Sequence, residues 1–152
     1  VYEIEKCLNA LKKSIENKVI KQELLPLDRD SKLKVLVIAP YSAQIIQAKT
    51  IIGNTSIYPF DVEFNSIDAV QGREADIVFF SCVRSNNYQE VGFMGHKNWR
   101  RINVALSRAR LKVHIVGDAY FWQSTKSALS DVVTYLKSQN SDQFYLRDLA
   151  ND

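Results

Sequence analysis

An uninterrupted run of apolar residues, Val-Leu-Val-Ile at 35–38, is the sequence feature that most constrains the fold. A strand that is apolar on both faces is typical of a parallel sheet with helices on each side. Pro40 follows the run and ends this strand, which we place at 33–39. Three further short strands are predicted around 62–65, at 76–82 and at 112–117. The sequence therefore predicts an α/β fold with a mainly parallel sheet.

Amphipathic helices are predicted between and beside these strands, because apolar residues recur at spacings of three and four. Ser42 is the expected N-cap of the helix after the first strand, and Gly53 is placed to end it. Polar segments at 21–32 and 85–98 are predicted as loops. The predicted helices span residues 4–19, 42–52, 100–108 and 124–137.

One domain is expected for the whole chain, 1–152, because this length and a hydrophobic content of 46% suffice for a single core but not for two. We divide it into an N-terminal helix and loop (1–30), a central core (33–118) and a C-terminal helix and tail (124–152). The tail is polar apart from the pattern Phe144, Leu146 and Leu149.

Charge and cysteine content narrow the class of protein. The 20 Lys and Arg residues against 17 Asp and Glu give a net charge of +3. This charge is compatible with a polyanionic partner but does not by itself indicate one. Cys7 and Cys82 lie far apart and there are two histidines, so neither a zinc site nor a disulfide framework is indicated. We find no apolar run of about 18 residues and no signal peptide pattern. We therefore expect a soluble, intracellular protein with no membrane segment and no metal site of its own.

Three polar segments are candidates for function, because ligands of open parallel sheets bind beyond the carboxyl ends of the strands. The first segment follows the strand 33–39 and contains Pro40, Tyr41 and Gln44. The backbone N–H groups at the start of the next helix are suited to a phosphate of a nucleic-acid backbone. The alternative is a simple strand end followed by a helix cap.

The second segment, SIDAVQGREAD, joins the second and third predicted strands. Gly72 would let the backbone approach a ligand closely, and Glu74 is an acceptor of the type that binds ribose hydroxyls. The alternative is a capped turn in which Asp68 caps a helix and Arg73 pairs with Glu74 or Asp76.

The third segment, RRINVALSRAR, begins at Arg100, and its apolar residues lie on one helical face. Arg101 and Arg108 are about two turns apart and are expected to project from one broad side of that helix. The planar guanidinium matches phosphate oxygens, so the helix would place a cation on a phosphoryl group in transfer. The alternative is a basic surface helix that forms salt bridges. The apolar face consists of Ile102, Ala105, Leu106 and Ala109.

Together these segments resemble the superfamily-1 helicases of the nonsense-mediated-decay and senataxin type, which include the tRNA-splicing endonuclease positive effector group. The resemblance runs from about Val35 to Asp118 and rests on VIAPYSAQ, SIDAVQGREADIVFFSCVRS and GFMGHKNWRRINVALSRARLKVHIVGD. The last two match the family's motifs V and VI. The resemblance implies a RecA-like fold, which is the three-layer sandwich of P-loop NTPases, and specifically the second, C-terminal domain of such a helicase.

The resemblance also implies roles for individual residues. Arg108 matches the arginine finger, the catalytic residue that reaches the γ-phosphate of ATP. Gln71 lies where nucleotide contacts meet nucleic-acid contacts. The nucleotide-binding candidates are Gln71, Gly72, Arg73, Glu74 and Arg101. The candidates that face single-stranded nucleic acid are Pro40, Tyr41, Gln44, Ser66 and Asp68.

Several motifs that a whole helicase of this type contains are missing from this sequence. It contains no GxxxxGK[ST] loop, no acidic motif for Mg²⁺ and no Gln-Tyr-Arg-Met-type motif. We therefore expect that the first RecA-like domain of the parent chain supplies the metal and the phosphate loop for Mg-ATP. The isolated chain should not hydrolyse ATP, because hydrolysis needs all these groups in one closed cleft.

The expected function is the C-terminal half of an ATP-dependent helicase or translocase. Its expected partners are single-stranded RNA or DNA and the first RecA-like domain. The expected compartment is the nucleus or the cytoplasm, with the nucleus favoured. The alternative is a non-catalytic α/β interaction or regulatory module derived from this fold. A nuclease or nucleotide-transfer enzyme is disfavoured, because Asp68, Glu74 and Asp76 are explained by the roles above and no clustered carboxylates with metal-ligand character are left.

Overall fold

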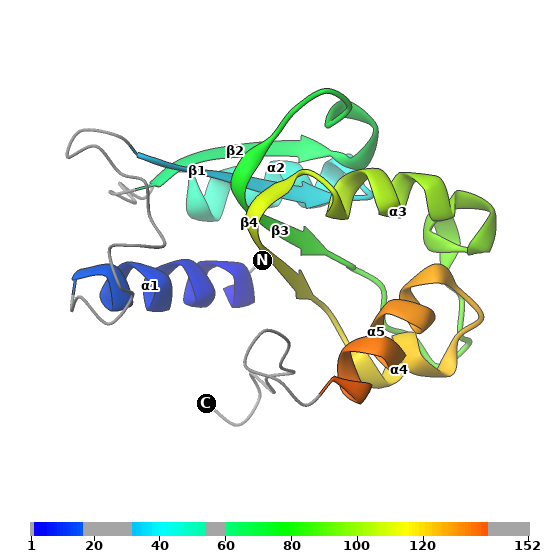
Figure 1. Ribbon diagram of the computed structural model, residues 1–152. Coiled ribbons are helices and arrows are strands. Elements are labelled where there is room, and N and C mark those ends of the chain that lie inside the picture. The colour runs from blue at the N-terminus through cyan, green and yellow to red at the C-terminus, as the bar shows by residue number, and fades with distance from the viewer. Residues whose placement is uncertain (1, 17–31, 54–59, 140–152) are drawn as a thin grey trace.

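The computed structural model describes residues 2–16, 32–53 and 60–139 (Figure 1). The strands within these ranges form one parallel sheet in the order β2-β1-β3-β4. They are β1 (Leu33–Ala39), β2 (Phe60–Ser66), β3 (Ala75–Ser81) and β4 (Ala109–Val116). The predicted α/β fold with a parallel sheet is confirmed.

Helices cover both faces of this sheet (Figure 1). The α-helices are α1 (Tyr2–Glu16), α2 (Ser42–Ile52), α3 (Trp99–Leu106), α4 (Ala119–Ser124) and α5 (Ala128–Ser138). Short 3₁₀ helices lie at Ile67–Ala69, Gly92–Met94 and His96–Asn98.

Two apolar cores lie on opposite faces of the sheet and explain the three layers. The first core joins α1 and α2 to Val35, Val37 and Phe79. The second joins α3, α4 and α5 to Ile38 and Phe80. Successive side chains of a strand point to opposite faces, so the central residues of β1 and β3 contribute apolar side chains to both cores. This is why the apolar run of β1 predicted the architecture.

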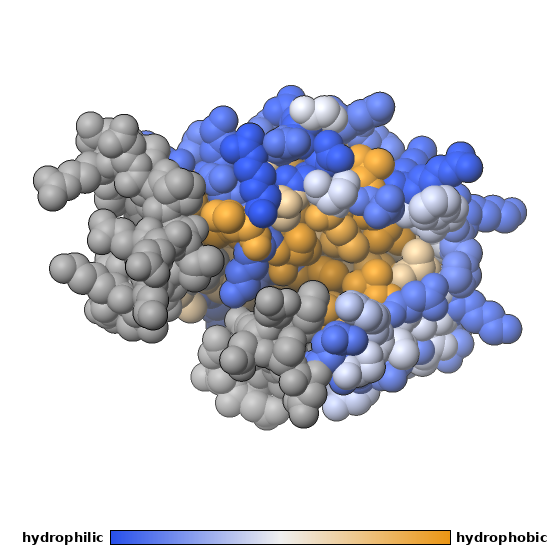
Figure 2. All heavy atoms as spheres, viewed as in Figure 1, coloured by the Kyte–Doolittle hydropathy of each residue, from blue (hydrophilic) through white to orange (hydrophobic). Residues whose placement is uncertain are grey.

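Part of the surface remains apolar. Figure 2 shows apolar side chains gathered over the sheet between α3 and α5. Leu111 and Val113 of the edge strand β4 are exposed. None of the helices in the described ranges has the length and apolar composition needed to cross a bilayer.

The boundary between α3 and β4 differs from the prediction. The predicted helix 100–108 ends at Leu106, and β4 begins at Ala109 rather than at Lys112. Ala109 pairs in register with Ala75, and the N–H of Ala75 donates to the carbonyl of Arg108 at 3.0 Å. These contacts across the sheet override the helical spacing of the local sequence.

The C-terminal helical region also differs. The helix predicted at 124–137 is α5, which begins at Ala128, and it is preceded by a short helix, α4, that was not predicted. Asp118 caps α4 by accepting a hydrogen bond from the N–H of Phe121 at 2.9 Å. Ser127 caps α5 by accepting from the N–H of Ser130 at 3.2 Å. Each cap satisfies an N–H group that the start of a helix leaves without a partner.

Smaller corrections concern the segments near the N-terminus. The N-cap of α2 is Tyr41, and Ser42 is the first helical residue, whereas Gly53 ends the helix as predicted. The first helix is confirmed within 2–16. Residues 17–19 of that prediction, most of the loop predicted at 21–32, and the apolar pattern of the tail lie outside the described residues.

Candidate functional site

The candidate residues lie at both ends of the strands and not at one. We call the side where the strands end the carboxyl edge and the side where they begin the amino edge. Tyr41 follows the carboxyl end of β1, and Ser66 is the last residue of β2. Glu74 and Arg108 instead precede the amino ends of β3 and β4. The expectation that all three segments lie beyond the carboxyl ends is therefore wrong. Parallel strands require a crossover back to the starting edge, and SIDAVQGREAD is that crossover.

Arg108 lies in the turn between α3 and β4. Its Nε donates to the carbonyl of Val104 at 2.9 Å, and its terminal nitrogens donate to the carbonyl of Arg73 at 3.3 Å and to Ser107 Oγ at 3.0 Å. A guanidinium has five N–H donors, so two of them have no partner among the residues that the structure describes. No carboxylate pairs with Arg108 within the described ranges. Neutral acceptors therefore hold a partly buried positive charge without neutralising it.

The turn before β3 places its residues beside Arg108. The N–H of Arg73 donates to the carbonyl of Val70 at 3.1 Å and closes a turn in which Gly72 has a φ of +78°. A side chain at Gly72 would be strained at this positive φ. Gln71 and Gly72 are exposed, so the turn presents backbone and amide groups to solvent.

Arg73 pairs with neither of the two carboxylates, Glu74 and Asp76, that the sequence suggested as its partners. Its guanidinium binds Glu63 of β2, and its Nε donates to the carbonyl of Ala69 at 3.2 Å. The pairing of Arg73 with Glu74 or Asp76 is therefore wrong.

Glu74 is paired with Arg110, whose Nε lies 3.2 Å from its carboxylate. The same arginine lies 4.0 Å from Asp76, which accepts a hydrogen bond from the backbone N–H of Lys34 at 2.9 Å. The side chains of Glu74 and Arg110 are more than half exposed. An ion pair this exposed contributes about 0–1 kcal/mol, so a ligand can displace it at small cost.

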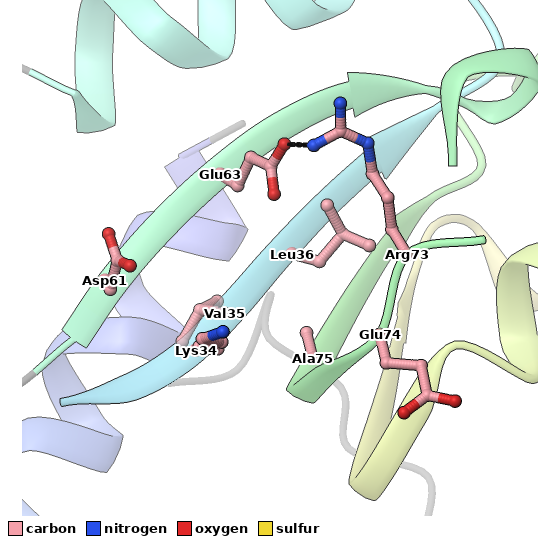
Figure 3. A pocket seen from close by; sticks show the side chains of 8 residues that line it. All are labelled: Lys34, Val35, Leu36, Asp61, Glu63, Arg73, Glu74 and Ala75. Atoms are coloured by element: carbon pink, nitrogen blue, oxygen red, sulfur yellow. Dashed lines mark hydrogen bonds and ion pairs between the residues drawn. The ribbon is translucent and has the colours of Figure 1, made fainter. Parts of the chain in front are cut away.

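A cavity of about 230 Å³ lies beside this turn (Figure 3). In Figure 3 the side chain of Arg73 passes Leu36 to reach Glu63, whereas Glu74 points away from that pair. The carboxylates in the lining outnumber its cations, so the charge of the cavity does not favour a phosphate. In the described ranges we find no cluster of three or more metal-ligating side chains. The lining residues are Lys34, Val35, Leu36, Asp61, Glu63, Arg73, Glu74 and Ala75.

Arg101 lies apart from Arg108. Its Nε is 3.2 Å from a carboxylate oxygen of Asp68, and its guanidinium lies 4.3 Å from the centre of the Phe93 ring. The prediction that Arg101 and Arg108 share one side of a helix is wrong, because α3 ends before Arg108. The alternative role of Asp68 as a helix cap is not seen, since Ser66 occupies the cap position of that 3₁₀ helix. Arg101, expected on the nucleotide side, therefore contacts Asp68, which was expected on the nucleic-acid side.

The carboxyl edge brings the other candidates together. Ala39 and Ser66 are neighbours in the register of β1 and β2, which places Pro40 beside the end of β2. The carbonyl of Tyr41 accepts a hydrogen bond from the N–H of Gln44 at 3.1 Å, within the first turn of α2. That edge therefore combines an aromatic ring, an amide, a hydroxyl and the start of a helix.

Three residues of this edge were missed by sequence reasoning. Arg84 Nε donates to the hydroxyl of Tyr41 at 3.1 Å. The hydroxyl of Ser85 donates to Asp118 at 2.7 Å. The hydrogen bond from the N–H of Phe121, and then the one from Ser85, lower the pKa of Asp118. The signal was available for Arg84, because it follows β3 almost directly and the rule on carboxyl ends applies there too.

Comparison with known proteins gives a match over most of the chain. A family model described as AAA domain covers residues 1–120. The DNA polymerase alpha-associated DNA helicase A of Schizosaccharomyces pombe is 40% identical over 85 residues, which is 56% of this chain and 12% of that protein. The Regulator of nonsense transcripts 1 of Dictyostelium discoideum is 40% identical over 87 residues, or 57% of this chain and 6% of that protein. Helicase sen1 of Schizosaccharomyces pombe is 37% identical over 89 residues, or 56% and 5%. The chain thus spans about an eighth or less of these relatives.

Proposed function

The chain belongs to the AAA domain family, and from this premise we propose that it is the second RecA-like domain of an ATP-dependent helicase or translocase. Its relatives are helicases of superfamily 1, of the nonsense-mediated-decay and senataxin type. In this proposal the chain supplies the arginine finger and part of the nucleic-acid track. The first RecA-like domain of the parent protein supplies the phosphate loop and the metal for Mg-ATP.

The state of Arg108 is the observation that carries the proposal. Three neutral acceptors fix the guanidinium at the amino edge of the sheet, and two of its N–H groups have no partner in the described part of the chain. A positive charge that is preorganised but not neutralised is suited to the charge that develops on a transferring phosphoryl group. A salt bridge would have weakened that charge, as it does for Arg73 with Glu63.

The other residues of the amino edge have supporting roles. The carbonyl of Arg73 fixes one terminal nitrogen of Arg108, so the turn at 70–73 positions the finger. Glu74 would exchange Arg110 for a sugar hydroxyl when nucleotide enters, because their ion pair is exposed. Gln71 and Gly72 complete the exposed surface that would face the nucleotide.

The carboxyl edge would hold single-stranded RNA or DNA. Pro40, Tyr41 and Gln44 lie at the start of α2, and Ser66 and Asp68 lie at the end of β2 and in the following 3₁₀ helix. These groups suit contacts to the sugar-phosphate backbone and to base faces, which do not depend on sequence. We place the protein in the nucleus or the cytoplasm, where such strands occur.

The test compares ATP turnover of this chain with that of the longest natural protein that contains it. We expect strand-stimulated turnover in the longer protein only. In that protein Arg108→Ala should lower kcat by about 10³- to 10⁵-fold. Arg108→Lys should remain impaired, because an ammonium cannot reproduce the planar fork of the guanidinium. Arg100→Ala is the matched control, since Arg100 is exposed and contacts the Trp99 ring.

Two results would contradict the proposal. Unchanged turnover in Arg108→Ala would remove the arginine finger from this chain. Absence of turnover in every form of the protein, with and without RNA or DNA, would favour a non-catalytic α/β module.

A further inference from the structure

We infer that Arg84 is a phosphate-contacting residue of the nucleic-acid track and that Tyr41 orients it. The inference rests on the proposed function, since it places a strand at the carboxyl edge of the sheet. It adds Arg84, which follows β3 at the end of the segment SIDAVQGREADIVFFSCVRS and to which no role has been assigned above.

The backbone before Arg84 is strained. Val83 has a φ of 61°, a conformation that is rare for a β-branched residue. The N–H of Arg84 donates to the carbonyl of Cys82 at 2.6 Å, so the chain reverses in a γ-turn centred on Val83. Val83 is 40% exposed, and burial of its side chain therefore does not explain this turn. Strained residues of this kind concentrate at binding sites, where they set the direction of a neighbouring side chain.

The turn directs Arg84 to the aromatic ring that follows β1. Arg84 Nε donates to the hydroxyl of Tyr41 at 3.1 Å, and the guanidinium lies 5.3 Å from the centre of the ring. The same hydroxyl accepts from the N–H of Phe93 at 3.4 Å. Tyr41 thus uses its hydroxyl as an acceptor twice, and the guanidinium is fixed in orientation by a neutral group.

The charge of Arg84 is not neutralised in the described part of the chain. Arg73, Arg101 and Arg110 each pair with a carboxylate. Arg84 has no such partner there, and it shares this property with Arg108 at the opposite edge. Asp118, which the neighbouring Ser85 reaches, already accepts from Ser85 and from the N–H of Phe121.

The surrounding loop keeps the guanidinium in place. A Cβ at Gly92 would lie 2.6 Å from the hydroxyl of Tyr41 and 3.1 Å from a terminal nitrogen of Arg84. A side chain at this position would displace these two groups, and its φ of +54° also favours glycine. The loop therefore closes on Tyr41 and Arg84 without covering them with another side chain at this position.

The chemistry of this arrangement indicates a phosphodiester. Within the described residues one of the five N–H donors of Arg84 has a partner, and the two terminal nitrogens remain to bind two phosphate oxygens through parallel N–H bonds. Its neighbour Tyr41 offers a ring on which a base can stack. Neither contact reads base identity, so the site should bind RNA or DNA strands of any sequence.

Binding of a fluorescein-labelled single-stranded oligonucleotide to the chain tests the inference. Arg84→Gln should weaken binding about tenfold at moderate salt and lower the slope of log K against log[salt] by about one. Arg100→Gln is the matched control, because it removes the same charge from an exposed arginine. Tyr41→Phe should weaken binding less than Arg84→Gln and leave that slope near its original value, since the charge remains.

A change in the ligand separates a lost contact from a damaged fold. An oligonucleotide with neutral methylphosphonate linkages should bind the original chain and Arg84→Gln with nearly equal affinity, whereas a damaged fold would weaken binding of both oligonucleotides. Equal affinities of Arg84→Gln and Arg100→Gln for the natural oligonucleotide would overturn this inference alone. Failure of the unchanged chain to bind any strand would overturn the proposed track together with it.

Discussion

Acid should destabilise this fold through His114, a partly buried histidine on the edge strand β4. Its ring is stacked on Phe79, with 4.6 Å between the ring centres and an angle of 8° between the planes. Its Nε2 has no hydrogen-bond partner among the residues that the structure describes. Burial, and then the positive charge of Lys112, lower the pKa of His114 from 6.5 to about 4. The folded state therefore resists protonation of this ring.

The direction and size of the effect follow from this difference. Above pH 6.5 the ring is neutral in both states, and the full stability is present. As the pH falls from 6.5 towards 4, the unfolded chain binds a proton that the folded chain does not, and stability decreases. Each pH unit in this window costs about 1.4 kcal/mol, so the free energy of unfolding should fall by about 2 kcal/mol between pH 7 and pH 5.

Urea unfolding at pH 7, 6 and 5, followed by tryptophan fluorescence, measures this free energy. The variant His114→Phe keeps a ring for stacking on Phe79 but cannot titrate. Its free energy of unfolding should therefore fall by about 2 kcal/mol less than that of the unchanged chain between pH 7 and pH 5. His96→Gln, at an exposed position, is the matched control. Equal losses of stability in the unchanged chain and in His114→Phe would refute the reasoning.

Three further substitutions or treatments have defined outcomes. Gly92→Ala should weaken oligonucleotide binding and lower the free energy of unfolding by at least about 1 kcal/mol, because its Cβ would meet the Tyr41 hydroxyl at a positive φ; unchanged binding would contradict this packing. Asp118→Ala should destabilise the chain by about 1 kcal/mol in thermal unfolding through loss of the α4 cap, whereas Asp118→Asn should retain most of that stability. The pKa of the Cys82 thiol is raised to about 12 by burial, so iodoacetamide at pH 8 should modify it only after unfolding, and rapid modification of the native chain, mapped by mass spectrometry, would count against this.

The layers of the fold were predictable because they depend on local composition. The uninterrupted apolar residues of β1 identify a strand buried on both faces, and its bounds were predicted correctly. The end of α3 was not predictable in the same way. Ala109 continues the helical spacing of Ile102 and Ala105, yet it belongs to β4 because it pairs with Ala75 across the sheet. Pairing between residues distant in sequence leaves no periodic signal.

The site was predictable in its residues more than in its arrangement. The sequence indicated the turn around Gly72, but it did not indicate that this turn and Tyr41 lie at opposite edges. The γ-turn at Val83 had no sequence signal at all, since valine disfavours a positive φ. The ion pair of Arg101 with Asp68 joins α3 to the segment after β2, and only the tertiary fold brings them together.

Helix α3 connects the two edges, and this determines how variants in it must be interpreted. Its first turn carries Arg101, which is paired with Asp68 near the proposed strand track. Its last turn carries Val104, whose carbonyl fixes the Nε of Arg108 at 2.9 Å. A helix of eight residues is about 12 Å long and moves as a rigid unit, so a shift at one end displaces groups at the other. A loss of ATP turnover in an Arg101 variant therefore does not by itself place Arg101 in the nucleotide site. Oligonucleotide binding has to be measured beside turnover, because a direct nucleotide contact would alter the KM for ATP while leaving strand affinity unchanged.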